Sequence, residues 1–139
     1  MSFSFLTKDD AALLLPFLKK KLFHAGSILI DEGQVPSCCW LLVTGRLLVK
    51  KQTTYPGRFV TIALLDPGAI VGEQLLAESI GHTTTVTALD DVELLELSSR
   101  SWEDFVRAHP EAAVRFLRYV LGISSLRLQG ATRRLADLL

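Results

Sequence analysis

The polarity pattern of residues 7–21 indicates a short helical region with an interruption. Apolar residues recur there at helical spacing, at Leu13, Leu14, Phe17 and Leu18. Thr7 is suited to cap the first turn, and Asp9 and Asp10 suit the positive end of the helix dipole. Because Pro16 lacks a backbone N–H group and stands inside this pattern, we expect two short turns or a kinked helix.

From residue 22 to residue 98 the helical period gives way to short β-rich runs with turn residues between them. Six runs predict strands: Ser27–Ile30, Trp40–Val43, Leu47–Lys50, Phe59–Leu65, Thr83–Leu89 and Val92–Leu97. Many short strands at close intervals predict an antiparallel barrel or sandwich. There is no β–α–β alternation, no GxGxxG motif and no P-loop lysine motif, which excludes the doubly wound nucleotide-binding folds.

The helical period returns after Leu97 and continues to the end of the sequence. Ser101 to Asp104 resembles a capping box, and Pro110 is expected to end one helix and open the next. The pattern from residue 111 to 139 predicts one long helix of roughly 42 Å. Its apolar and small residues form a seam at steps of four and three: Leu117, Leu121, Ser124, Leu128, Ala131, Leu135 and Leu138. The seam predicts a homodimer through this helix; the alternative is a helix folded back on its own domain.

Composition limits the classes of protein that fit this sequence. The 139 residues suffice for one domain, 1–139, divided into a helical segment (7–21), a β-barrel (22–98) and C-terminal helices (99–139). The apolar runs are too short to span a bilayer and the N-terminus is unlike a signal peptide, so we expect a cytoplasmic protein without membrane contact. The formal net charge is zero, which argues against direct nucleic-acid binding by this chain. Of the adjacent Cys38 and Cys39, one is expected to be buried and one exposed.

The run Asp-Pro-Gly-Ala-Ile-Val-Gly-Glu-Gln-Leu-Leu at residues 66–76 resembles the phosphate-binding cassette of cyclic nucleotide-binding domains. Residues 26–33 and 41–49 resemble the first strands and hairpin of that family, and residues 83–88 and 92–97 resemble its closing strands. The last helices are similar to its B and C helices. The resemblance covers nearly the whole chain in order. It implies a mainly β fold with flanking helices: an antiparallel double-stranded β-helix, or jelly-roll barrel, with an N-terminal helical segment and a long C-terminal helix.

The chemistry of such a cassette depends on backbone N–H groups that face an anion. Gly72 permits a close backbone approach, and the carboxylate of Glu73 can accept a hydrogen bond from a ribose hydroxyl. In register with the family, the phosphate-binding arginine is replaced by His82, which cannot form the same bidentate contact. Leu75 stands where the family has a small residue, so it is expected to crowd the anion. These two departures predict that binding of cAMP or cGMP is weak or lost.

The resemblance implies a regulatory, ligand-sensing domain that signals through its C-terminal helix, in a transcription regulator or another signalling system. The candidate ligand is a cyclic nucleotide, cAMP or cGMP, and no metal or other cofactor is assigned. The candidate ligand-binding residues are Val71, Gly72, Glu73, Gln74, Leu75, His82, Thr83, Thr84 and Arg127. Arg127 is either a lid cation over the ligand or a solvated residue of the helix face.

Two other functions stay open at this point. One is a non-liganded interaction domain that pairs through the helical seam, which the residues at positions 75 and 82 favour. The other is a haem-based gas sensor with His24 or His109 as iron ligand, although their spacing gives it no support. No nucleophile elbow, zinc-binding spacing or carboxylate pair occurs, so we expect no enzymatic activity. The last helix carries a basic set that we expect to be a solvated face: Arg115, Arg118, Arg127, Arg133 and Arg134.

Overall fold

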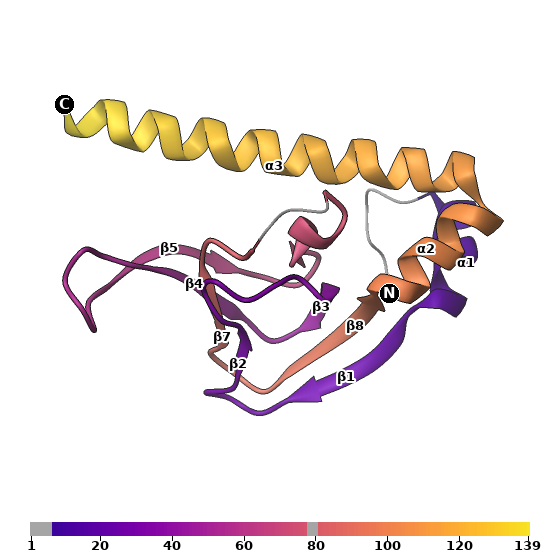
Figure 1. The fold of residues 1–139 in the computed structure, drawn as a ribbon, viewed down its shortest axis with the longest axis horizontal. Helices are drawn as coiled ribbons and strands as arrows, with labels where there is room; N and C mark the ends of the chain where they lie inside the picture. The colour runs from indigo at the N-terminus through magenta and orange to yellow at the C-terminus, as the bar shows by residue number, and fades with distance from the viewer. Residues whose placement is uncertain (1–6, 78–80) are drawn as a thin grey trace.

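The computed structural model describes residues 7–77 and 81–139, and within them eight strands form two four-stranded antiparallel sheets (Figure 1). One sheet has the order β1-β8-β3-β6, with bounds Lys19–Phe23, Val92–Ser98, Cys38–Thr44 and Ile70–Val71. The other has the order β2-β7-β4-β5, with bounds Ile28–Ile30, Thr85–Ala88, Leu47–Gln52 and Phe59–Leu65. The sheets face each other as a jelly-roll sandwich with flanking helices, so the predicted fold class is confirmed.

Alternating side chains on the central strands create two cores. On β8, Val92 and Leu94 face the opposite sheet, whereas Leu95 and Leu97 face the helices. The core between the sheets contains Ile30, Trp40, Leu42, Leu47, Leu65, Val71, Val86, Ala88, Val92 and Leu94. The core under the helices contains Leu14, Cys39, Leu41, Ile70, Leu75, Leu95, Leu97, Trp102, Phe105, Ala112, Ala113, Phe116 and Val120. The β1-β8-β3-β6 sheet is therefore the central layer, with apolar contacts on both faces.

The N-terminal helical segment is interrupted at the predicted place but ends earlier than predicted. Helix α1 spans Lys8–Leu14 and is capped by Thr7, whose side chain accepts a hydrogen bond from the backbone N–H of Asp10. A single 3-10 turn, η1 (Leu15–Phe17), carries the proline. The expected helical segment to residue 21 was wrong at its end, because residues 19–23 form β1 at the edge of the central sheet. Ion pairs from two of its lysines to glutamates of β8 favour this pairing over a helix.

Helix α2 starts at a different cap from the one predicted, whereas α3 starts where it was expected. Helix α2 spans Ser99–Ala108 and is capped by Ser98, whose hydroxyl accepts from the N–H of Ser101, so the box predicted from Ser101 to Asp104 was placed three residues too late. Helix α3 spans Pro110–Leu138 with Pro110 in its first turn, as predicted. His109 joins the helices through its backbone, and its side chain caps neither.

Helix α3 is held to the domain at its start and extends across it (Figure 1). Its buried residues are Ala112, Ala113, Phe116 and Val120. At this end the guanidinium of Arg115 donates to both carboxylate oxygens of Asp10, at 2.7 and 2.8 Å, so this predicted face residue instead joins α3 to α1. Beyond Val120 the seam stays open: Leu121 is 67%, Leu128 69% and Leu135 60% exposed. Within the described residues, no helix has both the length and the apolar character needed to cross a membrane.

Candidate functional site

A tight turn at Gly72 shapes the cassette. Strand β6 ends at Val71, Gly72 adopts a left-handed conformation (φ 78°), and the 3-10 turn η2 (Glu73–Leu75) follows. A Cβ atom at position 72 would lie 2.6 Å from the backbone oxygen of Cys38. The turn therefore needs glycine for two reasons, its backbone conformation and its close approach to β3. This close packing brings the side chains of η2 to the edge of the sandwich that faces α3.

A cavity of about 460 Å³, which we call the cassette pocket, lies between the β2-β7-β4-β5 sheet, η2 and α3. Its predicted lining residues are Val71, Gly72, Glu73, Gln74, His82, Thr83, Thr84 and Arg127. Its apolar wall comes from sheet residues that the sequence motif does not identify: Ile30, Val49, Ile62, Ala63, Leu65 and Val86. Helix α3 lines one side of the pocket with Leu126, Arg127, Gly130, Ala131 and Arg134. A volume of this size is in the range of small-molecule binding sites.

Leu75 lies elsewhere than expected. Its side chain is 8% exposed and belongs to the core under the helices, not to the lining of the cassette pocket. The η2 turn directs Glu73 and Gln74 to the pocket and Leu75 toward the core. The expectation that Leu75 crowds an anion was therefore wrong, because the turn points this side chain inward. Of the two departures from the family's cassette, Leu75 therefore does not argue against phosphate binding, and only His82 still does.

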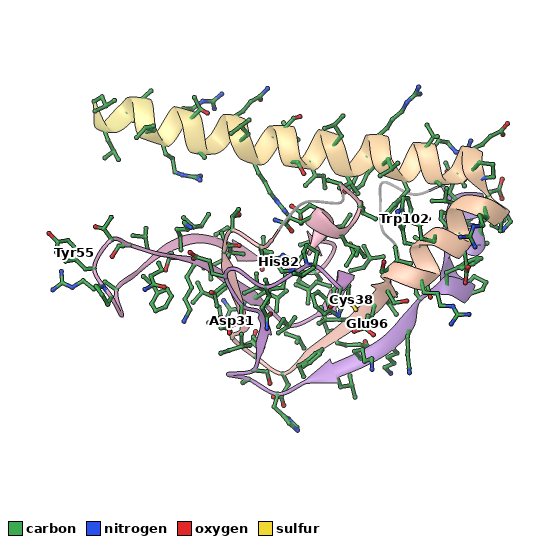
Figure 2. The ribbon with its side chains drawn as sticks, in the orientation of Figure 1. Asp31, Cys38, Tyr55, His82, Glu96 and Trp102 are labelled. Atoms are coloured by element: carbon green, nitrogen blue, oxygen red, sulfur yellow. The ribbon has the colours of Figure 1, made fainter. Side chains whose placement is uncertain are left out.

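His82 is the buried polar residue of the pocket wall. It is 7% exposed, and its Nδ1 atom has no hydrogen-bond partner among the described residues. Its backbone is fixed, because its N–H donates to the carbonyl of Gln34 and its carbonyl accepts from the N–H of Gly33. Burial lowers the pKa of His82, and the charge of Glu73 opposes that shift only in part. The side chain thus offers a neutral imidazole with one unused ring nitrogen, below the middle of α3 (Figure 2).

Arg127 contacts the cassette directly. Its Nη1 donates to Oε1 of Glu73 at 3.1 Å, and its Nη2 donates to the carbonyl oxygen of Ile70 at 3.0 Å. The sequence left this arginine open between a lid cation and a solvated face. The structure places it on the pocket, bridging α3 to both sides of the Gly72 turn. The contact joins positions far apart in the chain, so no local sequence pattern could have identified it.

Arg134 is a second arginine on the pocket wall, whereas the sequence predicts it on a solvated face. One of its terminal nitrogens lies 3.7 Å from where a Cβ on Gly130 would stand. It makes no hydrogen bond or ion pair within the part of the chain that the structure describes. Arg134 follows Arg127 by two helical turns, and this spacing is a signal that could have placed both on one face.

The remaining histidines and the cysteines lie away from the cassette pocket. The side chain of His24 is 97% exposed, with its Nδ1 atom 3.7 Å from a carboxylate oxygen of Asp91. His109 packs against the rings of Phe17 and Phe105 at the helix junction. Cys39 is buried and Cys38 partly buried. Across residues 7–77 and 81–139, no group of three or more histidine, cysteine or acidic side chains could hold a metal ion.

Comparison with known proteins gives consistent results. The family model of the cyclic nucleotide-binding domain matches residues 20–109. The cyclic AMP receptor protein of Thermus thermophilus is 26% identical over 108 residues, covering 78% of this chain and 50% of that protein. Glutaminase 2 of Bradyrhizobium diazoefficiens is 30% identical over 134 residues, covering 96% of this chain and 20% of that protein. A cyclic nucleotide-binding domain from Methylobacillus flagellatus kt shares the fold, with a TM-score of 0.87 at 19% identity over 96% of this chain and 75% of that one.

These matches concern one region of larger proteins. The chain spans half the length of the Thermus relative and a fifth of the glutaminase. The segment matched by the family model runs from β1 to the end of α2 and includes the cassette with its Gly72 turn. The chain therefore belongs to the cyclic nucleotide-binding domain family.

Proposed function

We propose that this chain is a regulatory domain, without catalytic activity, that senses a small ligand in the cassette pocket and signals through α3. The observation that carries the proposal is the composition of the pocket wall. Residues of the sheet, of the cassette and of α3 line the same cavity. A ligand there touches the rigid sandwich and the long helix together, so its binding depends on where the helix lies. A ligand shifts such an equilibrium only by its difference in affinity for the two positions.

Helix α3 is anchored unequally, which suits a signalling role. Its first part is fixed by buried Phe116 and by the ion pair between Arg115 and Asp10. After Val120 none of its described residues is buried, and Arg127 donates hydrogen bonds from this part of the helix to Glu73 and Ile70. Local motion is easiest where few apolar contacts hold an element. The part of α3 that covers the pocket is therefore the part that can respond to a ligand.

A cyclic nucleotide is the ligand class that the family membership favours. The backbone turn at Gly72 and the carboxylate of Glu73 are retained, and the leucine that was expected to obstruct the turn is buried. His82 cannot replace an arginine as a bidentate partner for phosphate. We therefore expect cAMP or cGMP to bind more weakly than in a domain that has the arginine, and Glu73 to release Arg127 when it accepts a ribose hydroxyl.

Thermal-shift titration of the full chain with cAMP, cGMP and 5′-AMP tests this proposal. A ligand at a hundred times its dissociation constant adds about 2.7 kcal/mol to the free energy of unfolding, a shift of several degrees. We expect cyclic nucleotides to raise Tm, Glu73→Gln to abolish the shift, and the matched control Glu103→Gln, an exposed residue of α2, to retain it. His82→Arg should strengthen binding. If neither the natural chain nor His82→Arg responds, cyclic nucleotide sensing is refuted and a non-liganded interaction domain is the better account.

We also propose that α3 pairs with α3 of a second copy through its seam. The seam leucines are exposed in the isolated chain, and Leu117, Leu121 and Ser124 also line an apolar groove of about 520 Å³ beside η2. Glu73 and Gln74 border this groove as well as the cassette pocket. A change at η2 on ligand binding would therefore reach the dimer surface directly.

The oligomeric state tests the pairing. We expect a dimer by sedimentation equilibrium, and a monomer for the double variant Leu121→Glu with Leu128→Glu. Arg133→Glu, on the opposite side of α3, is the matched control and should leave the mass unchanged. A natural chain that remains monomeric across the concentration range would reject pairing through the seam, while leaving ligand sensing in a monomer intact.

A further inference from the structure

The charged side chains of the cassette pocket are divided unequally between the sandwich and α3. Among the described lining residues, the cassette contributes the carboxylate of Glu73, and α3 contributes the guanidinium groups of Arg127 and Arg134. Glu73 is paired with Arg127 at 3.1 Å, whereas Arg134 has no described partner. Burial lowers the pKa of His82, which keeps this residue neutral near pH 7. Among the described residues of the pocket wall, one positive charge is therefore not balanced by a carboxylate, and this charge is on Arg134 of α3.

We infer that the cassette pocket takes a small molecule with one acidic group, and that Arg134, beside Arg127, binds that group from α3. This inference rests on the proposed ligand-sensing function and deepens it by naming the ligand chemistry. A guanidinium group presents a planar fork of N–H donors that matches a phosphate or a carboxylate. The resemblance to the family places such an arginine on the sandwich. In this chain, the equivalent charge stands on the helix that covers the pocket.

The helix is built to leave room for that group. Gly130 and Ala131 line the pocket between the two arginines, and neither has a side chain large enough to fill the space. A glycine inside a helix lowers the stability of that helix by about 1 kcal/mol relative to alanine, so Gly130 does not stabilise α3. The Arg134 guanidinium lies next to Gly130, with one terminal nitrogen 3.7 Å from where a Cβ at that position would stand.

The opposite wall suits the uncharged end of the ligand. The Nδ1 atom of His82 is buried without a described partner, and a buried polar atom left unpaired is unfavourable. Thr83 and Thr84 line the pocket beside it and add two hydroxyl groups. A ligand that spans the pocket can therefore pair a neutral hydrogen-bonding group with His82 and its acidic group with Arg134. Apolar residues of the sheet would cover its body.

Binding the charge from α3 has a direct consequence for signalling. When the anion is held by the sandwich, the helix adds only secondary contacts. When it is held by Arg134, moving the helix removes the main charge contact. The affinity for the ligand and the position of α3 are then one linked equilibrium.

NMR spectroscopy of the ¹⁵N-labelled full chain tests the inference with simple probes. Inorganic phosphate and, separately, acetate are titrated at constant ionic strength while the Nε–H signals of the arginines are followed. We expect saturable shifts at Arg134 and Arg127 and none at Arg133. Arg134→Gln should weaken the response of the Arg127 signal by about tenfold or more. The matched control, Arg133→Gln, removes the same charge one residue away and should leave the response unchanged. A response to phosphate alone assigns the acidic group as phosphate; a response to both assigns a general acid site.

Equal, non-saturable shifts at Arg133 and Arg134, or an Arg127 response that survives Arg134→Gln, would overturn the inference. The nucleotide titration separates its failure from that of the proposed function. Retention of a cyclic nucleotide thermal shift by Arg134→Gln means that ligand sensing stands and the α3 charge site does not. Saturable phosphate binding without any nucleotide shift means that the acid site stands and the cyclic nucleotide proposal does not.

Discussion

Replacement of Gly72 by alanine tests whether the cassette turn is as tightly packed as the structure shows. The residue has φ 78°, and its missing Cβ would stand 2.6 Å from the carbonyl oxygen of Cys38. Gly57 provides a matched control. It has φ 79°, but nothing lies within 4 Å of its missing Cβ. The two glycines therefore share the backbone requirement and differ in the close contact.

The expected magnitudes follow from that difference. A side chain in the left-handed region costs about 1–2 kcal/mol at either position. The loss of unfolded-state freedom from Gly to Ala also acts at both positions, so it cancels in the comparison. At Gly72 the backbone must also shift to relieve the contact with Cys38, and such overpacking adds about 1–3 kcal/mol. Gly72→Ala should thus lower the free energy of unfolding by about 1–3 kcal/mol more than Gly57→Ala does.

Urea denaturation of both variants, at one protein concentration, measures this difference. The midpoint should fall further for Gly72→Ala with an unchanged m-value, which marks a change in stability and not in compactness. The reasoning would be refuted if the free energies of unfolding of the two variants differed by less than about 0.5 kcal/mol, which is the usual error when two mutations are compared. It would mean that the cassette turn relaxes freely, and that the proximity of β3 does not hold η2 in place.

Three further outcomes are expected from local contacts. Ser98→Ala removes the cap of α2 and should lower the free energy of unfolding by about 1 kcal/mol in urea; an unchanged midpoint would contradict the assigned cap. The Arg115 guanidinium holds the pKa of Asp10 below its ordinary value of 3.8. The stability that this pair contributes should therefore be complete above about pH 3.8 and be lost as the pH falls through the pKa of Asp10 in the folded state. Measuring the free energy of unfolding as the pH is lowered should show this loss in the natural chain and not in Asp10→Asn. Burial raises the pKa of the Cys38 and Cys39 thiols, and Cys38 is the more accessible of the two. Iodoacetamide should therefore label Cys38 slowly and Cys39 only after unfolding, as measured by mass spectrometry. Early labelling of Cys39 would contradict its burial.

Strand prediction from the sequence succeeded where the hydrophobic pattern was strong. The run Phe59–Leu65 is β5 with the same bounds, and the other five predicted runs each overlap a strand, although their ends differ by one to two residues. Strand β1 was missed because it begins with three lysines and lies at a sheet edge, where its stability comes from pairing with β8. Strand β6 has only two residues, Ile70–Val71, which is too short for any periodic signal.

The site was predictable in its local part and not in its long-range part. The cassette motif located Gly72, Glu73 and their neighbours, because the family resemblance lies in contiguous residues. The direction of Leu75 depends on the geometry of a single 3-10 turn, which residue type does not determine. The contact between Arg127 and Glu73 depends on how α3 crosses the sandwich, and that angle is set by packing at the far end of the helix. Long-range placement of this kind requires the assembled fold.

The position of β8 has a consequence for the synthesis of the chain. This strand lies between β1 and β3, and Lys19 pairs with Glu96, so the central sheet lacks its middle strand until the chain from β1 to β8 has been made. At ribosomal speeds of about 5–20 residues per second, β1 waits on the order of 4–15 s for its partner. An unpaired strand invites association with other chains, and lysines on a strand discourage it. The three lysines that begin β1 would thus protect the nascent chain before any ligand pocket exists.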